Sequence, residues 1–148
     1  MADKLLDSTN SQLRLFDNGD GSYSAAIKLT GRKVEEIILH NVLAIRDTAN
    51  HNSSYIDISN LSGKKYLHIT NDLDQSVDVT LLIATAGTTD FALVAGQTKT
   101  ITAGTWDTVT AADIRELAEP LQQISVRLKC SIAPTTGTVT VFLEGVQT

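Results

Sequence analysis

A strict alternation of apolar and polar residues near the end of the chain constrains the fold most. Ile124, Val126, Leu128, Cys130 and Ile132 occupy one side of this pattern, and Ser125, Arg127, Lys129 and Ser131 the other. A period of two residues indicates a β-strand with one buried face. The pattern returns at 138–143, and the stretch 133–137 between the two runs is rich in turn-forming residues. The two runs therefore predict an antiparallel hairpin.

Shorter runs of the same kind predict further strands. The hairpins that they indicate join 66–70 to 77–83, 91–95 to 98–102, and 13–15 to 23–29. The first hairpin in the chain would turn at Asp17-Asn-Gly-Asp-Gly, where the glycines supply the positive φ of a tight turn. Residues 33–45 fit either a helical stripe or a strand face. Their β-branched content favours an extended segment.

One short helix is predicted near 111–119. Thr110 can cap its N-terminus, the charge of Asp113 suits the helix dipole, and Pro120 ends it. Strands at short, regular intervals predict an all-β fold, an antiparallel β-sandwich with jelly-roll-like or Greek-key connections. We expect a flexible N-terminal arm at 1–11 and a single β-sandwich domain at 12–148.

Composition argues against several classes of protein. The net charge of -5 argues against a nucleic-acid-binding module. The apolar runs are far shorter than the roughly 20 residues of a membrane helix, and the first ten residues lack the apolar region of a Sec-type signal. A single Cys excludes an internal disulfide. We therefore expect neither nucleic acid nor membrane as a partner.

Two acidic stretches invite a calcium hypothesis. An EF-hand loop needs oxygen ligands at its third and fifth positions and Glu at its twelfth. If Asp17 is the first position of such a loop, these three positions hold Gly19, Gly21 and Lys28, so the pattern fails. The second stretch contains Asp72, Asp74 and Asp78. Asp is common in turns because its carboxylate accepts local hydrogen bonds, so we favour a structural role over a cation site. No metal ligands are predicted.

Zinc and catalytic sites have little support. His40, His51 and His68 lie in three separate segments, and Cys130 lies on the apolar side of its strand, where nothing lowers its pKa. Asp47, His51 and Ser53 share one polar loop, but without a nucleophile elbow such a loop is better interpreted as a connector. We predict no catalytic residue, no cofactor and no enzymatic activity.

Trp106 is the only tryptophan, in a stretch that reads as a loop before the predicted helix. A single Trp more often anchors a loop to the core, and a sugar-stacking platform is the alternative.

Two parts of the chain resemble a known group of proteins. The residues concerned are Leu13-Arg-Leu-Phe-Asp-Asn-Gly-Asp-Gly-Ser-Tyr-Ser24, Val42-Leu-Ala-Ile-Arg-Asp-Thr48, Ser53, Ser54, Ile56-Asp-Ile-Ser59 and Lys65-Tyr-Leu-His-Ile-Thr-Asn-Asp-Leu-Asp-Gln-Ser-Val77. Together they resemble small virion structural proteins of tailed bacteriophages, in which a DNGDGSYS-type hairpin precedes an AIRDT segment. The resemblance covers about residues 12–83.

The resemblance implies a non-enzymatic structural protein of the virion, assembled in the cytoplasm of the bacterial host. It favours a capsid decoration or head-associated protein that contacts other copies of itself and the major capsid protein. A neck, tail or fibre component is the alternative. A carbohydrate- or receptor-binding module, with a shallow site near Trp106 or Tyr55 and weak glycan binding, is a second alternative, and a hydrolase on a sandwich scaffold a third.

Overall fold

The computed structural model describes residues 13–17, 23–27, 33–84 and 92–147, and the chain divides into two compact units, Met1–Arg32 and Lys33–Thr148. In the first unit, β1 (Leu13–Asp17) pairs antiparallel with β2 (Tyr23–Ile27). This pairing confirms the predicted N-terminal hairpin. Its turn and residues 1–11 lie outside the described residues, so the flexible arm stays a prediction.

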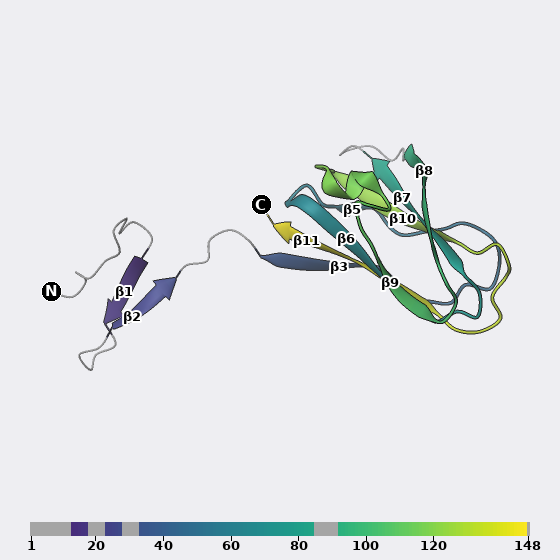
Figure 1. Ribbon diagram of the computed structural model, residues 1–148, viewed down its shortest axis with the longest axis horizontal. Helices are drawn as coiled ribbons and strands as arrows, with labels where there is room; N and C mark the ends of the chain where they lie inside the picture. Colours follow the sequence, from purple (N-terminus) through teal and green to yellow (C-terminus); the bar gives the residue numbers. More distant parts are fainter. Residues whose placement is uncertain (1–12, 18–22, 28–32, 85–91, 148) are drawn as a thin grey trace. The chain divides into compact units, whose positions relative to one another are not determined.

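The second unit is a sandwich of two antiparallel sheets (Figure 1). One sheet, which we call the β11 sheet, has the order β3-β11-β6-β9, with β3 at Val34–Leu43, β11 at Val139–Gln147, β6 at Leu61–Asn71 and β9 at Thr105–Val109. The other, the β10 sheet, has the order β4-β10-β7-β8, with β4 at His51–Asn52, β10 at Gln123–Lys129, β7 at Val77–Ala84 and β8 at Ala92–Ile101. The short strand β5 (Ile56–Asp57) also pairs with β10.

The strand order is that of a jelly roll. If β4 and β5 are counted as one interrupted strand, each sheet has four strands, and most successive strands lie in opposite sheets. The predicted antiparallel β-sandwich is therefore confirmed. Within the described ranges, no helix has the length and hydropathy needed to cross a membrane.

Two predicted hairpins are wrong. The strands β10 and β11 lie in different sheets, and so do β6 and β7. Both connections cross the sandwich at the same end, where Asp72 N donates to Thr138 O (2.8 Å) and Asp74 N to Thr136 O (3.3 Å). Alternation indicates only that one face of a strand is buried, and both sheets bury a face in the same core, so the pattern does not identify the partner strand.

The predicted hairpin of 91–95 and 98–102 is also wrong, because β8 is one strand. It pairs with β7 from Val77↔Ile101 to Ile83↔Ala92. The register shifts between the pairs Thr80↔Thr98 and Leu82↔Leu93, so β8 has more residues than β7 over this interval. The extra residues of β8 form a bulge. Gly96 lies inside that irregularity.

Residues 33–45 are extended, as the β-branched content indicated. The strand β3 is an edge strand, with register shifts in its pairing to β11. Val42 lies beside one of them with φ +49°, and its N–H donates to Thr140 Oγ1 (3.2 Å). A β-branched residue in the left-handed region is strained.

The predicted helix at 111–119 forms only a 3₁₀ turn, η1 (Arg115–Ala118). Thr110 does begin a turn, since its Oγ1 accepts from Ala112 N (3.2 Å) and its N–H donates to Asp113 Oδ2 (3.2 Å). Ile114 is then extended (φ −129°, ψ 103°), which interrupts the helix. Both Ile114 and Leu117 are fully buried, so core packing overrides local helix propensity here.

The core lies between the two sheets. It takes alternate residues from each strand, such as Leu67 and Ile69 of β6 and Val126 and Leu128 of β10. Cys130 is buried as predicted, but Ile132 is 63% exposed, because β10 ends at Lys129 and the chain leaves the sheet.

Lys65 is a fully buried lysine at the inner side of β6. Its Nζ donates to Glu119 O (2.7 Å) and Gly63 O (3.0 Å), which ties the segment after η1 to β6. Burial lowers the pKa of Lys65, because the charged ammonium loses its hydration.

Candidate functional site

The outer face of the β11 sheet, the side turned away from the core, carries an ordered array of side chains. Cross-strand partners share a face, and the register places Ile38, Phe142, His68 and Thr108 in one row across all four strands. The next row along the strands contains Glu36, Glu144 and Tyr66.

His68 is the centre of this array. Its Nε2 lies 2.6 Å from Glu144 Oε2 and its Nδ1 lies 3.1 Å from Thr108 Oγ1. Its ring stacks on Phe142, with centroids 4.7 Å apart and planes 27° apart. Because the two neighbouring strands β9 and β11 hold the imidazole by hydrogen bonds and stacking, its ring is fixed in orientation at the surface of the sheet.

A carboxylate, an imidazole and a hydroxyl in sequence resemble the order of groups in a catalytic triad. The three groups project from the face of a sheet, and the N–H of Thr108 is bound to Asp107 Oδ1 (2.7 Å), so it does not supply an oxyanion donor. The array can donate and accept hydrogen bonds and stack against rings, which is the chemistry of recognition.

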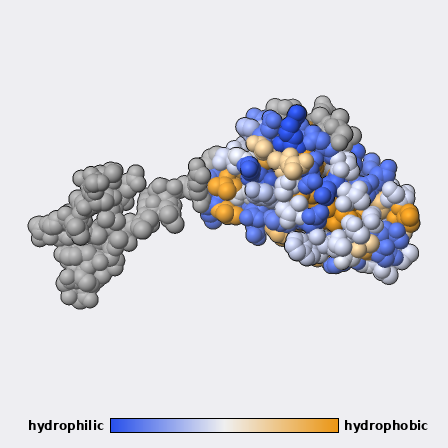
Figure 2. Space-filling model, viewed as in Figure 1, coloured by the Kyte–Doolittle hydropathy of each residue, from blue (hydrophilic) through white to orange (hydrophobic). Residues whose placement is uncertain are grey.

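Large hydrophobic side chains are exposed at both edges of the same sheet. On β3, Val34 is 53% exposed and Ile38 and Val42 are each 60% exposed. On β9, at the opposite edge, Trp106 is 76% exposed. Figure 2 shows small hydrophobic patches in an otherwise hydrophilic surface on the visible face of this unit. Apolar residues concentrated on edge strands are typical of contact surfaces.

The interpretation of Trp106 as a core anchor is wrong. Trp106 belongs to β9, where it and Thr108 point outward while Val109 is buried. The signal that could have shown this is the alternation in Thr105–Val109, which is short and interrupted by the inward-facing Asp107.

The loop that contains Asp47, His51 and Ser53 does not assemble a triad. Asp47 Oδ1 lies 2.7 Å from His51 Nε2, and this hydrogen bond, followed by one from Ala49 N, lowers the pKa of Asp47. The hydroxyl of Ser53 instead contacts Ser125 Oγ (3.1 Å) and accepts from Val126 N (2.9 Å). Ser53 thus joins the loop to β10, and Ser125, predicted to face solvent, is buried by it.

The three histidines have separate partners. His40 is buried and bonds to Val126 O (2.8 Å) across the sandwich, while His51 and His68 bond to the carboxylates of Asp47 and Glu144. Burial raises the pKa of the Cys130 thiol, aided by nearby aspartates, which keeps it protonated.

The acidic stretch at 72–78 serves local structure. Asp74 binds the N–H and the hydroxyl of Thr135, and Asp78 accepts from Thr100 Oγ1 (2.6 Å). Among the residues that the structure describes, no group of three or more potential ligands is placed to hold a metal ion.

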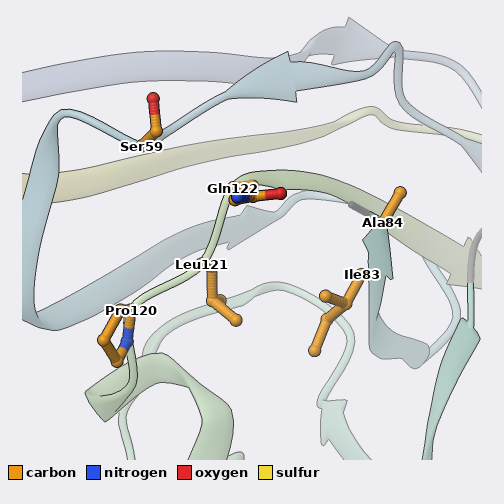
Figure 3. Close-up of a pocket in the computed structure, with 6 residues that line it drawn as sticks. All are labelled: Ser59, Ile83, Ala84, Pro120, Leu121 and Gln122. Atoms are coloured by element: carbon orange, nitrogen blue, oxygen red, sulfur yellow. The ribbon is translucent and has the colours of Figure 1, made fainter. Parts of the chain in front are cut away.

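A pocket of about 560 Å³ opens at one end of the sandwich, near the residues that follow η1. Its described lining consists of Ser59, Ile83, Ala84, Pro120, Leu121 and Gln122 (Figure 3). The side chains of Ile83 and Leu121 point to the same side in the view. None of these six residues titrates near neutral pH, so they provide no acid or base for catalysis.

Comparisons with known proteins give distant structural matches. No model of a protein family matches the chain, and no curated protein matches its sequence. Among solved structures, infectious bursal disease virus (Gx strain) aligns at 15% identity and TM-score 0.41, over 91% of this chain and 38% of the viral chain. The carbohydrate-binding module CBM28, specific for non-crystalline cellulose, aligns at 12% identity and TM-score 0.43, over 91% of this chain and 79% of the module.

A CBM4 structure aligns at 16% identity and TM-score 0.32, over 97% of this chain and 92% of that chain. The protein thus spans little more than a third of the viral chain and most of each module. At these identities and TM-scores the likeness assigns neither a family nor an activity.

Proposed function

We propose that this protein is a non-enzymatic structural component of a tailed-bacteriophage virion, a capsid decoration or head-associated protein that acts through protein–protein contacts. A neck, tail or fibre position is the alternative. The proposal joins the sequence resemblance over residues 12–83 with one structural observation, the exposed apolar row on the edge strand β3. Jelly rolls also recur in viral capsid domains, which is an analogy at the level of the fold.

The exposed apolar residues of β3, which we call the β3 row, follow one another along the strand rather than across the sheet. They are Val34, Ile38 and Val42, each more than half exposed. The inner neighbours of the row, Ile37 and Leu39, pack against the core, so the row is not a misplaced core face. Edge strands present backbone groups that can pair with another chain, and apolar side chains beside them add buried area on contact. A neighbouring subunit that covers this edge would gain both.

Two other groups of residues argue against a catalytic role. The Asp47–His51 pair lacks a nucleophile, and the Glu144–His68–Thr108 array lies on an open sheet face without an oxyanion donor at Thr108. Protein contacts need only a rigid, exposed surface, which the β11 sheet provides.

The first test is the copy number of the chain in purified virions, measured by quantitative mass spectrometry against the major capsid protein. Hundreds of copies per particle support decoration of the capsid. Only a few copies per particle, as in one small cyclic ring, support a neck, tail or fibre position. Absence from particles would refute the virion proposal.

The second test compares Ile38→Ser with Ile132→Ser. The two isoleucines are 60% and 63% exposed, so both changes leave stability almost unaltered. Only Ile38 lies in the β3 row. We expect Ile38→Ser to reduce occupancy on particles, with Ile132→Ser at the level of the parent. Equal occupancy of both variants would refute the role of β3.

A further inference from the structure

We propose that Trp106 and the side chains around it form a binding site for a neutral saccharide at the β9 edge of the β11 sheet. Trp106, the centre of the site, lies at the opposite edge of the sheet from the β3 row, since β3 and β9 are its two edge strands. The ligand contact at Trp106 is therefore distinct from the subunit contact proposed at the β3 row.

The exposure of Trp106 is the first observation. Its side chain is 76% exposed although it belongs to a regular strand. Thr105 Oγ1 donates to Thr102 O (2.8 Å) at the start of β9, and Asp107 Oδ2 contacts Lys99 Nζ of the other sheet (3.6 Å). The strand is thus held on both sides of Trp106, and the indole is presented from a fixed backbone.

The surroundings of Trp106 are rich in hydroxyl groups. Its cross-strand partner is Thr70, which pairs in turn with Thr140, and Thr108 is the next outward residue of β9. The core of a protein–protein interface is more apolar than its rim, and the outward neighbours of Trp106 are threonines. An aromatic ring among hydroxyl groups instead suits a ligand that has an apolar C–H face and hydroxyl groups at its rim, which is the chemistry of a sugar ring.

A second ring platform lies one row along the sheet. The His68 ring stacks on Phe142 and is bound to Glu144 and Thr108, so its orientation is fixed before any ligand binds. Its neighbours offer hydroxyl and carboxylate oxygens for hydrogen bonds. Two ring platforms on one rigid sheet face can contact successive units of an extended chain, and little ordering is needed on binding.

The charges on this face select among saccharides. Glu36 and Glu144 are cross-strand partners, and both project from the outer face. Two carboxylates repel an anionic sugar and accept hydrogen bonds from neutral hydroxyl groups. We therefore expect binding of neutral polysaccharides and none of uronic-acid polymers.

Trp106 also makes the site measurable, because it is the only tryptophan in the chain. Fluorescence titration of the full chain with dextran, galactomannan, laminarin and hydroxyethyl cellulose, and with alginate as the anionic polymer, reports directly on this ring. We expect a blue shift or quenching with at least one neutral polymer and no change with alginate. Silence with all four neutral polymers, or a response to alginate alone, would overturn the proposal.

Affinity electrophoresis in gels that contain the responding polymer tests the residues. We expect Trp106→Ala to weaken binding by about tenfold or more, and Trp106→Tyr to restore part of it. Tyr55→Ala, which removes a partly exposed aromatic ring between β4 and β5, should bind like the parent. Thermal unfolding of each variant verifies that it folds. Retained binding in a folded Trp106→Ala protein would refute the site, whatever the outcome of the particle experiments.

Discussion

Gly137 precedes β11 and allows the closest backbone contact found among the described glycines. Its φ is +87°, and a Cβ added there would lie 1.9 Å from Asp72 O and 2.8 Å from the Leu73 Cα. Atoms essentially never approach a Cβ closer than 3.0 Å, so Gly137→Ala must move the backbone by about 1 Å. Gly104, with φ +70° and open space around it, is the matched control.

The magnitude follows from what the movement would break. The left-handed conformation alone costs an alanine about 1–2 kcal/mol at either position. At Gly137, displacement of Asp72 also disrupts its N–H bond to Thr138 O and the contacts of Asp74 with Thr135 and Thr136, each worth about 1 kcal/mol. We therefore expect a loss of about 1–2 kcal/mol for Gly104→Ala and about 3–5 kcal/mol for Gly137→Ala.

Urea unfolding followed by far-UV circular dichroism measures both variants against the parent. A loss of about 3–5 kcal/mol is a large part of the 5–15 kcal/mol that stabilises a typical domain. The midpoint for Gly137→Ala should fall much further than that for Gly104→Ala. Equal midpoints would show that the turn between β6 and β7 moves aside without loss of stability. That result would refute the argument from the close contact.

Two further predictions concern His40 and Val42. Burial lowers the pKa of His40; the charge of His51 adds to this effect, and the hydrogen bond to Val126 O partly offsets it. Because the unfolded chain then takes up the proton first, stability should fall as pH drops through about 6.5. Urea titrations at pH 5–7.5 should show this dependence weakened in His40→Gln. Val42→Gly should raise the free energy of unfolding by about 0.5–1 kcal/mol, because it relieves the strained φ of +49°. Ile38→Gly, at the same exposure on the same strand, should lower the free energy of unfolding. Equal losses of stability for the two variants in thermal melts would contradict the strain at Val42.

The sequence indicated the strands better than it indicated their partners. Alternation marked the positions of β6, β7, β10 and β11, because each strand has one face in the core, but it gave the bounds closely only for β7 and found half of β6. It could not show that β10 and β11 lie in different sheets, since that depends on the stretch between them crossing the sandwich. Turn-rich composition is equally compatible with a hairpin and with a crossing loop.

Local signals also failed where tertiary contacts dominate. The capping groups of Thr110 and Asp113 are used as predicted, yet Ile114 turns extended to reach the core, so only a 3₁₀ turn follows. Trp106 was assigned to the interior because large aromatics usually are buried. The array around His68 needs the pairing of β6 with both β9 and β11, which a single sequence does not reveal.

The position of β11 between β3 and β6 has a consequence for biosynthesis. Its residues Val139–Gln147 supply the ladder to both neighbours, although they are the last of the described residues to be translated. Until they leave the ribosome, β3 and β6 have unpaired edges, and such edges make a nascent chain prone to aggregation. Folding of this sheet must then wait for its final strand, so dependence on holdase chaperones should be set by the rate of translation through the preceding residues.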